Sequence, residues 1–415
     1  MKKFLSNYKS TIILLVAIIV GGIIGLIFGQ NATVLKPFGD IFLNLLLVVI
    51  VPLIFLTITT SVAKMKKPKR LGKILGTIVL IFVITSLIAV IVGLFSTYFI
   101  KLVNPEDTEK IKEVLVTEEQ EETEEELTIA ERTVNLLTVN DFSKLLSRNN
   151  LIALLVFSII FGIAMNMSKE KAEPVLNFLN SANVIVNNII KIIMYYAPIG
   201  LGCYFAALVG SFGAEIAVGY LKTFIIYTVV AILFYIIVYT IYAFIAGGKK
   251  GIKAYWKNIL PATLTSIATC SSAASIPVNV ECAKKIGVPE DIAETTIPLG
   301  TSFHKDGSII GSMFKIMFLV CLFGTNVGSP GAIFSLLGIA LLANLLITAV
   351  PIGGGTISEM LIITMMGFPV AALPILTIIA TIIDPPATML NVVGDTASSM
   401  MVARIVDGKD WMKDS

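Results

Sequence analysis

The sequence is poor in charge and in the residues that build metal or disulfide sites. Only 14% of its 415 residues are Asp, Glu, Lys or Arg, whereas soluble domains contain about 25%. His304 is the only histidine, and the four cysteines have no paired spacing, so neither a zinc site nor a disulfide framework is indicated. A soluble enzyme is excluded. We expect no catalytic activity, no organic cofactor and no nucleic-acid partner.

Long hydrophobic runs are present instead. Hydrophobic residues make up 56% of the chain, and the mean hydropathy is +0.90. Uncharged runs of 20, 23 and 27 residues cover Ser10 to Gly29, Ile41 to Ala63 and Ile74 to Ile100. Each is long enough to cross the hydrocarbon layer, which takes about 20 helical residues. The chain is therefore predicted to be an all-α, multi-pass protein of the lipid bilayer.

Basic residues indicate the orientation of these spans, because cytoplasmic loops collect Lys and Arg. Lysines precede the first run, and six basic residues lie within positions 64–73. Further spans over 149–168, 174–214 and 223–248 keep the alternation of sides. We expect both termini to be cytoplasmic and the protein to lie in the cell membrane. The segment 105–132, with 12 acidic and 3 basic residues, is then an extracellular solvated loop.

The second half contains interrupted apolar segments. Residues 258–280 are uncharged but hold Pro261, Pro277 and a run of small polar residues between them, which favours a re-entrant hairpin. The segment 295–324 is broken at positions 303–308. A similar pattern recurs as an apolar stretch with glycines at 353–355, followed by a final polar-interrupted span. Paired interruptions of this kind are typical of secondary transporters with inverted repeats and a site at the bilayer midplane.

Ionisable residues inside these spans are the candidate functional groups. Each costs about 2.5–3.5 kcal/mol on insertion scales, so it should face a cavity, a partner or a substrate. Asp384, Asn391 and Asp395 are separated by 7 and 4 residues, which places them on one face of a helix. The alternative is a buried hydrogen-bond network that only joins helices. For His304 the alternative is a satisfied core group, and for Lys305 a neutralising pair with Asp306.

Three motifs, taken in order, resemble the dicarboxylate/amino-acid:cation symporter family, which includes archaeal sodium–aspartate transporters and mammalian glutamate and neutral amino-acid carriers. They are Ser271-Ser272, then Pro298-Leu299-Gly300 leading into Asp306-Gly307, and Asn391-Val392-Val393-Gly394-Asp395. The similarity covers the whole chain apart from the acidic loop.

This resemblance implies eight transmembrane helices plus two re-entrant hairpins, a homotrimer and an elevator mechanism. Residues 1–72 and 149–214 would form the scaffold, and residues 73–103 and 215–415 the transport domain. Residues 104–148 would form the acidic extracellular loop.

The resemblance also implies roles for individual residues. Those expected to bind an amino-acid substrate are Ser271, Ser272, Gly353, Gly354, Gly355, Asp384, Thr388 and Asn391. Those expected at the cation site are Thr85, Ser86, His304, Lys305, Asp306, Asn391 and Asp395. In such proteins the aspartate that matches Asp384 receives the substrate ammonium, and the glycines belong to the hairpin that closes over the substrate.

Two departures from the family pattern bear on the substrate. Ala387 and Cys270 stand where acidic-substrate members and some other members carry arginine. A second carboxylate would then lack a bidentate partner. We therefore predict a small neutral amino acid, with Lys305 as an alternative source of positive charge. The second interpretation is a sodium- or proton-coupled carrier of acidic amino acids or dicarboxylates.

A third departure bears on the coupled ion. His304-Lys305 replaces the family's Asn-Met before Asp306-Gly307. Sodium prefers hard oxygen ligands, and a protonated Lys305 would take the electrostatic role of a bound cation. We predict weak or absent sodium coupling, with protons or no ion instead. The alternative is a residual sodium site at Asp306, Asn391 and Asp395. A dedicated ion channel is a less favoured interpretation, because two hairpins suit occlusion better than an open pore.

Overall fold

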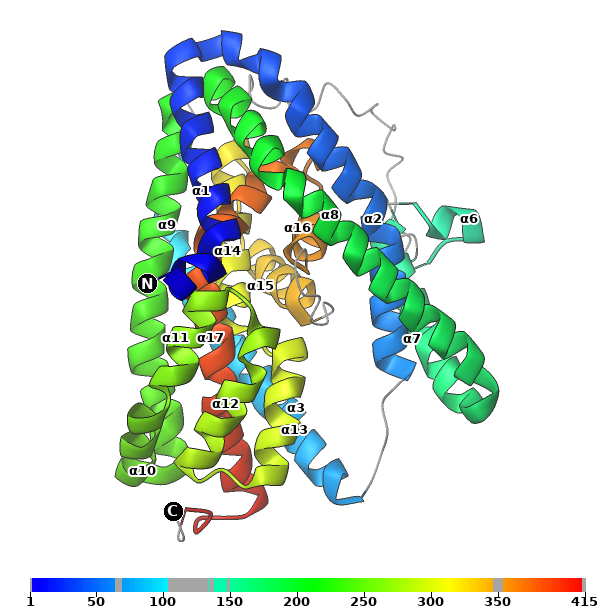
Figure 1. The fold of residues 1–415 in the computed structure, drawn as a ribbon, viewed down its shortest axis with the longest axis vertical. Helices are drawn as coiled ribbons and strands as arrows, with labels where there is room; N and C mark the ends of the chain where they lie inside the picture. The colour runs from blue at the N-terminus through cyan, green and yellow to red at the C-terminus, as the bar shows by residue number, and fades with distance from the viewer. Residues whose placement is uncertain are drawn as a thin grey trace.

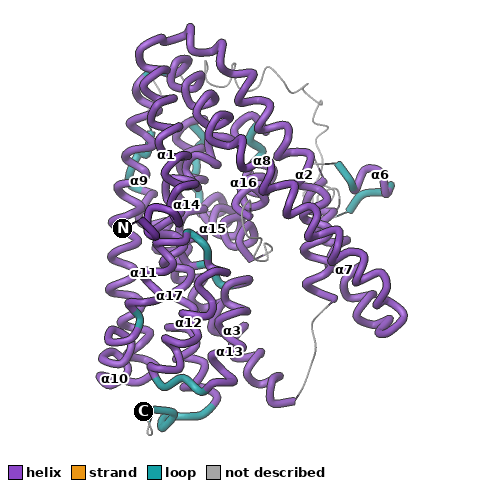
Figure 2. Tube along the Cα trace, viewed as in Figure 1, coloured by secondary structure: helices purple, strands orange, loops and turns teal. Residues whose placement is uncertain are grey.

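The computed structural model describes residues 2–63, 69–103, 134, 138–147, 150–345 and 354–412. Within these ranges every regular element is a helix, and short turns join the helices (Figure 2). Almost all of the acidic segment, along with Gly353, lies outside the described residues.

One group of helices comes from two separate parts of the sequence. It contains α1 (Lys2–Phe28), η1 (Gly29–Leu35), α2 (Lys36–Ala63), α7 (Leu151–Ser168), η3 (Lys169–Ala172) and α8 (Glu173–Phe212). The long α8 packs along both α1 and α2, and α7 packs against α2 (Figure 1). A Cβ on Gly21 would lie 2.1 Å from the carbonyl oxygen of Gly202, so these glycines allow the backbones of α1 and α8 to touch. The short α6 (Phe142–Leu145) precedes α7.

The second group surrounds α17 (Leu373–Val406), which follows the short η5 (Val370–Ala372). Its other long members are α3 (Lys69–Tyr98), α9 (Ala214–Leu233), the π-helical turn η4 (Phe234–Val238) and α10 (Tyr239–Asn258). Of these, α3, α9 and α10 pack against α17. The side chains of α17 from Ala387 to Ala403 are buried, so this helix forms the core of the group (Figure 1).

Three pairs of short helices complete this group. The first pair is α11 (Leu260–Thr269) with α12 (Ser272–Ile286), the second is α13 (Glu290–Phe303) with α14 (Asp306–Phe323), and the third is α15 (Pro330–Leu345) with α16 (Gly354–Met366). The partners pack against each other in the first and third pairs. The first pair turns at Cys270, whose φ of +46° is left-handed, and the Ser271 side chain caps α12.

Most of these helices lie where the sequence predicts spans and interruptions, but the span expected over 223–248 is part of a longer stretch formed by α9, η4 and α10. By length and composition, five helical stretches of the described residues can cross a membrane, or six if a bent pair within residues 156–211 counts as one span. The chain is therefore a multi-pass membrane protein. The number of eight spans and the depth of the hairpins stay predictions.

The chain folds back after α17. Trp411 Nε1 donates a hydrogen bond of 2.8 Å to the carbonyl oxygen of Ala246, and Lys250 donates to the carbonyl oxygen of Met412. This contact falls where α10 is bent, at Gly247 and Gly248. A Cβ on Gly247 would lie 2.6 Å from the Met412 sulfur, so the absence of a side chain there makes room for the tail.

Candidate cation and substrate site

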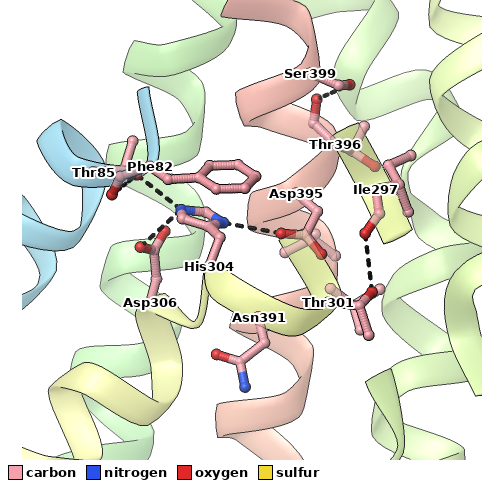
Figure 3. Close-up of polar contacts among 12 residues, drawn as sticks. Phe82, Thr85, Ile297, Thr301, His304, Asp306, Asn391, Asp395, Thr396 and Ser399 are labelled. Carbon is pink, nitrogen blue, oxygen red and sulfur yellow. Dashed lines mark hydrogen bonds and ion pairs between the residues drawn. The ribbon is translucent and has the colours of Figure 1, made fainter. Parts of the chain in front are cut away.

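The imidazole of His304 lies in a buried cluster built by four helices. His304 ends α13, Asp306 begins α14, and Asp395 comes from the middle of α17. Thr85 joins them from α3 (Figure 3). The side chains of His304 and Asp306 are fully buried, and that of Asp395 is 1% exposed. The ring also stacks on Phe82, with centroids 4.5 Å apart.

Both ring nitrogens face oxygen atoms. His304 Nδ1 lies 2.9 Å from Asp395 Oδ1. His304 Nε2 lies 2.8 Å from Thr85 Oγ1 and 3.1 Å from Asp306 Oδ1. Figure 3 shows the ring as a bridge between the two carboxylates.

These contacts suit a ring that is protonated on both nitrogens. An ionised carboxylate only accepts hydrogen bonds, so Nδ1 donates to Asp395. The Thr85 hydroxyl lies 2.9 Å from the carbonyl oxygen of Ile81 and, when it donates there, its oxygen accepts from Nε2. With a donor at each nitrogen, we assign His304 as an imidazolium, which neutralises one of the two carboxylates.

Oxygen atoms around the ring still have binding capacity. Asp395 Oδ2 is buried without a hydrogen-bond partner in the described part of the chain, and Asp306 Oδ1 has only its ion-pair contact with His304 Nε2. Ser86 Oγ on α3 is also buried without a hydrogen-bond partner there, and no described contact joins it to the ring. Buried polar atoms normally have partners. Hard oxygen atoms of this kind suit sodium, but the imidazolium occupies the space between the carboxylates and supplies a positive charge of its own.

Other titratable groups face the cluster from neighbouring elements. Lys305, the N-cap residue of α14, interacts electrostatically with Asp395. From α10, the Tyr239 hydroxyl donates to the Leu390 carbonyl oxygen at 2.7 Å and lies 3.2 Å from Asp306 Oδ2. Tyr242, also on α10, is close enough to interact with Asp306. His304 thus bridges the two carboxylates, and the cation's role that the sequence interpretation gave to Lys305 stays a prediction.

Two glycines let the helices approach the cluster. A Cβ on Gly300 would lie 2.2 Å from Asp395 Oδ1. A Cβ on Gly394 would lie 2.6 Å from the Tyr239 hydroxyl. Any side chain at these positions would push the carboxylate or the phenol away.

Asn391 supports the break between α13 and α14. Its Oδ1 accepts from the backbone N–H of Ser308 at 3.2 Å, and its Nδ2 donates to Ser308 Oγ at 3.0 Å. The Tyr227 hydroxyl donates to the carbonyl oxygen of Gly307 at 2.8 Å. Asn391 thus satisfies the Ser308 N–H, one of the backbone donors that the start of α14 leaves without an intrahelical partner, as a membrane interior requires.

The residues expected at the substrate are partly brought together. Asp384 and Thr388 are one turn apart on α17, and the Thr388 hydroxyl donates to Asp384 Oδ1 at 3.1 Å. On the α11–α12 turn, Ser271 Oγ accepts from the backbone N–H of Ala274 at 3.2 Å, and Ser272 begins α12. No described contact joins this turn to Asp384. Gly354 and Gly355 begin α16.

Sequence reasoning missed a second buried charge pair. Lys315 Nζ on α14 lies 3.2 Å from Glu359 Oε1 on α16. These two residues bound the 43-residue uncharged run, 316–358, so each was taken as the edge of an apolar segment. The sequence did contain a signal for this pair. Both residues are ionisable and lie in segments that the hydrophobic pattern had already placed in the membrane.

Comparison with known proteins identifies the group of transporters that this chain is similar to. A sequence profile of the sodium:dicarboxylate symporter family matches residues 11–405. The chain is 27% identical over 403 residues to the proton/sodium-glutamate symport protein of Geobacillus stearothermophilus, covering 94% of this chain and 92% of that protein. It is 28% identical over 398 residues to the C4-dicarboxylate transport protein of Rhizobium johnstonii, covering 94% and 87%.

Proposed function

Because the chain belongs to the sodium:dicarboxylate symporter family and is therefore a cation-coupled membrane transporter, we propose that it is a proton-coupled symporter of acidic amino acids or C4-dicarboxylates. Two parts of this proposal go beyond the family assignment. One is the coupling ion, and the other is the charge of the substrate.

The imidazolium of His304 carries the proposal on the coupling ion. It bridges Asp306 and Asp395 and contacts Thr85, so a proton on this ring balances charge that a bound cation would otherwise have to balance. If His304 lost this proton, the two buried carboxylates would repel each other, which is unfavourable in a low-dielectric interior. Proton binding and release at His304 would therefore change the stability of the α13–α14 break, and weak sodium dependence follows.

The names of the relatives favour the acidic substrate. The reported relatives are named for glutamate and for C4-dicarboxylates, which share two carboxylates. This favours the second interpretation of the sequence over a small neutral amino acid. Asp384 with Thr388 would receive the ammonium of an amino-acid substrate.

A small neutral amino acid is the second candidate, and one observation favours it. Ala387 occupies the position at which acidic-substrate members carry arginine, so α17 presents no guanidinium beside Thr388. Competition separates the candidates. Uptake of labelled glutamate or succinate that excess serine, alanine or cystine leaves unchanged supports the acidic substrate, whereas strong inhibition by these neutral amino acids supports the second candidate.

Transport by purified protein in proteoliposomes tests the coupling ion. We expect an inward proton gradient, without sodium, to drive accumulation of ¹⁴C-labelled glutamate or succinate. A sodium gradient at equal pH on both sides should add little. Uptake that rises steeply with sodium and ignores the proton gradient would refute proton coupling.

The assembly follows the same proposal. The α1–α2–α7–α8 group would be the scaffold of a homotrimer in the cell membrane, and the group around α17 would move as an elevator. Both termini would lie in the cytoplasm. A measured mass of three chains in detergent supports this arrangement, and a monomer at all concentrations contradicts it.

A further inference from the structure

The buried pair of Lys315 and Glu359 joins three helices at a distance from the His304 cluster. Lys315 Nζ lies 3.2 Å from Glu359 Oε1, and the two side chains are 8% and 1% exposed. The Thr377 hydroxyl on α17 donates to Glu359 Oε2 at 2.8 Å. The Glu359 carboxylate on α16 therefore contacts two other helices, α14 through Oε1 and α17 through Oε2.

This pair lies close to the groups proposed to handle the substrate. Thr377 precedes Asp384 by two helical turns on the same face of α17, about 10.5 Å in rise. Lys315 interacts electrostatically with Asp384. Gly354 and Gly355 precede Glu359 by five and four residues, about 6–8 Å along α16. Glu359, just beyond the glycines on α16, thus contacts α17, the helix that carries Asp384, while Lys315 holds the same carboxylate from α14.

Stability alone gives no reason for charges at this place. Apolar residues of similar size often replace a buried ion pair with no loss of stability, whereas removal of one partner is strongly destabilising. What a buried pair can supply is a single favoured arrangement, because any shift of α16 would separate the charges. The hydroxyl of the adjacent Ser358 is buried without a partner among the described residues, so it adds no second hydrogen bond at this point.

We propose that Lys315 and Glu359 are positioning residues for transport, which anchor the base of the α15–α16 hairpin. Through these contacts α16 stays attached to α14 and to α17, the helix that carries Asp384. This inference rests on the proposed function, in which Asp384 with Thr388 receives the substrate. Loss of the anchor frees α16 beside these groups, so substrate binds more weakly and escapes faster.

The double variant Lys315→Met/Glu359→Met removes the anchor without leaving a lone buried charge. In proteoliposomes we expect its KM for the transported ¹⁴C-labelled glutamate or succinate to rise by about tenfold, a typical size for coupling between sites. We also expect faster efflux of preloaded substrate, with kcat and Tm near those of the unmodified protein. Lys315→Arg keeps the pair and should restore the unmodified KM.

A matched control is the exposed pair at the α12–α13 connection. Lys284 Nζ contacts Glu290 at 2.5 Å, with side chains 30% and 72% exposed, and it also contacts the exposed Glu294 at 2.7 Å. Lys284→Met/Glu290→Met removes the same two charges outside the three-helix junction, and its KM and efflux should not change. An unchanged KM and unchanged efflux in the Lys315→Met/Glu359→Met variant would overturn the anchor.

Hydrogen exchange measured without substrate separates failure of the anchor from failure of the proposed function. We expect faster exchange of the α16 amides in the Lys315→Met/Glu359→Met variant, with α12 unchanged. Unchanged exchange in α16 would overturn the anchor whatever the substrate is. If the unmodified protein accumulates neither glutamate nor succinate while α16 exchange rises as expected, the proposed substrate is wrong and the anchor stands.

Discussion

His304 Nδ1 donates a 2.9 Å hydrogen bond to Asp395 Oδ1 in a fully buried environment. The bond links the break between α13 and α14 to the centre of α17, so the only histidine of the chain connects two of the elements proposed to carry the cation and the substrate. It also defines the first experiment on coupling.

Replacement of His304 by asparagine should convert the coupling from protons to sodium. The change removes the fixed positive charge and adds an amide oxygen beside Asp306 and Asp395, whose free oxygen atoms can then ligate a hard cation. We expect proton-driven uptake to be lost and sodium-stimulated uptake to appear. The measurement is initial uptake in proteoliposomes over a series of sodium concentrations at two pH values.

Thr85→Ser is the control for this experiment. It retains the hydroxyl that accepts from His304 Nε2, so its response to protons and sodium should match that of the unmodified protein. A His304→Asn protein that keeps proton-driven uptake would argue against the imidazolium as the coupling group.

Replacement of Asp384 by asparagine should abolish accumulation of an amino-acid substrate. The change removes the negative charge proposed to receive the substrate ammonium while keeping the shape of the side chain and an acceptor for Thr388. We expect a fall in kcat/KM of at least about a hundredfold, the scale of a lost buried charge pair of about 3 kcal/mol. Thr381→Val, one turn earlier on the same face, should leave uptake nearly unchanged. Full accumulation by Asp384→Asn would remove this residue from the substrate site.

The glycines beside the cluster should not tolerate a methyl group. In Gly300→Ala the new Cβ would lie 2.2 Å from Asp395 Oδ1, so the carboxylate or the helix must shift. Overpacking of this kind costs about 1–3 kcal/mol. We expect a lower Tm in detergent. Gly338→Ala in α15 is the control, because nothing lies within 4 Å of its Cβ, and it should keep or raise the Tm. Equal Tm values for the two variants would contradict the packing described here.

Asn279 provides a test of stability away from the proposed site. Its Nδ2 donates to the carbonyl oxygen of Val392 at 2.7 Å, and its Oδ1 accepts from Thr396, so it joins α12 to α17. Asn279→Leu leaves the buried Thr396 hydroxyl without this partner, which costs about 1–3 kcal/mol. We expect a lower Tm, measured in detergent. Asn258→Leu, at the half-buried end of α10, removes only hydrogen bonds to backbone carbonyl oxygens and should change the Tm less.

Much of the fold could be predicted because a membrane-spanning helix appears in the sequence as an uncharged run with charged residues at each end. The break at His304 and Lys305 was predictable for the same reason, since ionisable residues interrupt an apolar segment. The common face of Asp384, Asn391 and Asp395 followed from their spacing, and one continuous helix, α17, carries all three.

The contacts between distant segments could not be predicted from periodicity. Nothing in the local sequence indicates that the His304 ring bridges Asp306 and Asp395, because the direction of its side chain depends on the extended backbone at the break. The pairing of Lys315 with Glu359 was missed for a related reason. The two residues are 44 positions apart, and only the packing of α16 on α14 brings them together.

The tail that follows α17 has a practical consequence for anyone who handles this protein. Trp411 and Met412 pack into the bend of α10, so a purification tag or fluorescent reporter inserted directly after Met412 would adjoin a packed contact. A long flexible spacer there, or a label at the amino end, leaves that contact undisturbed.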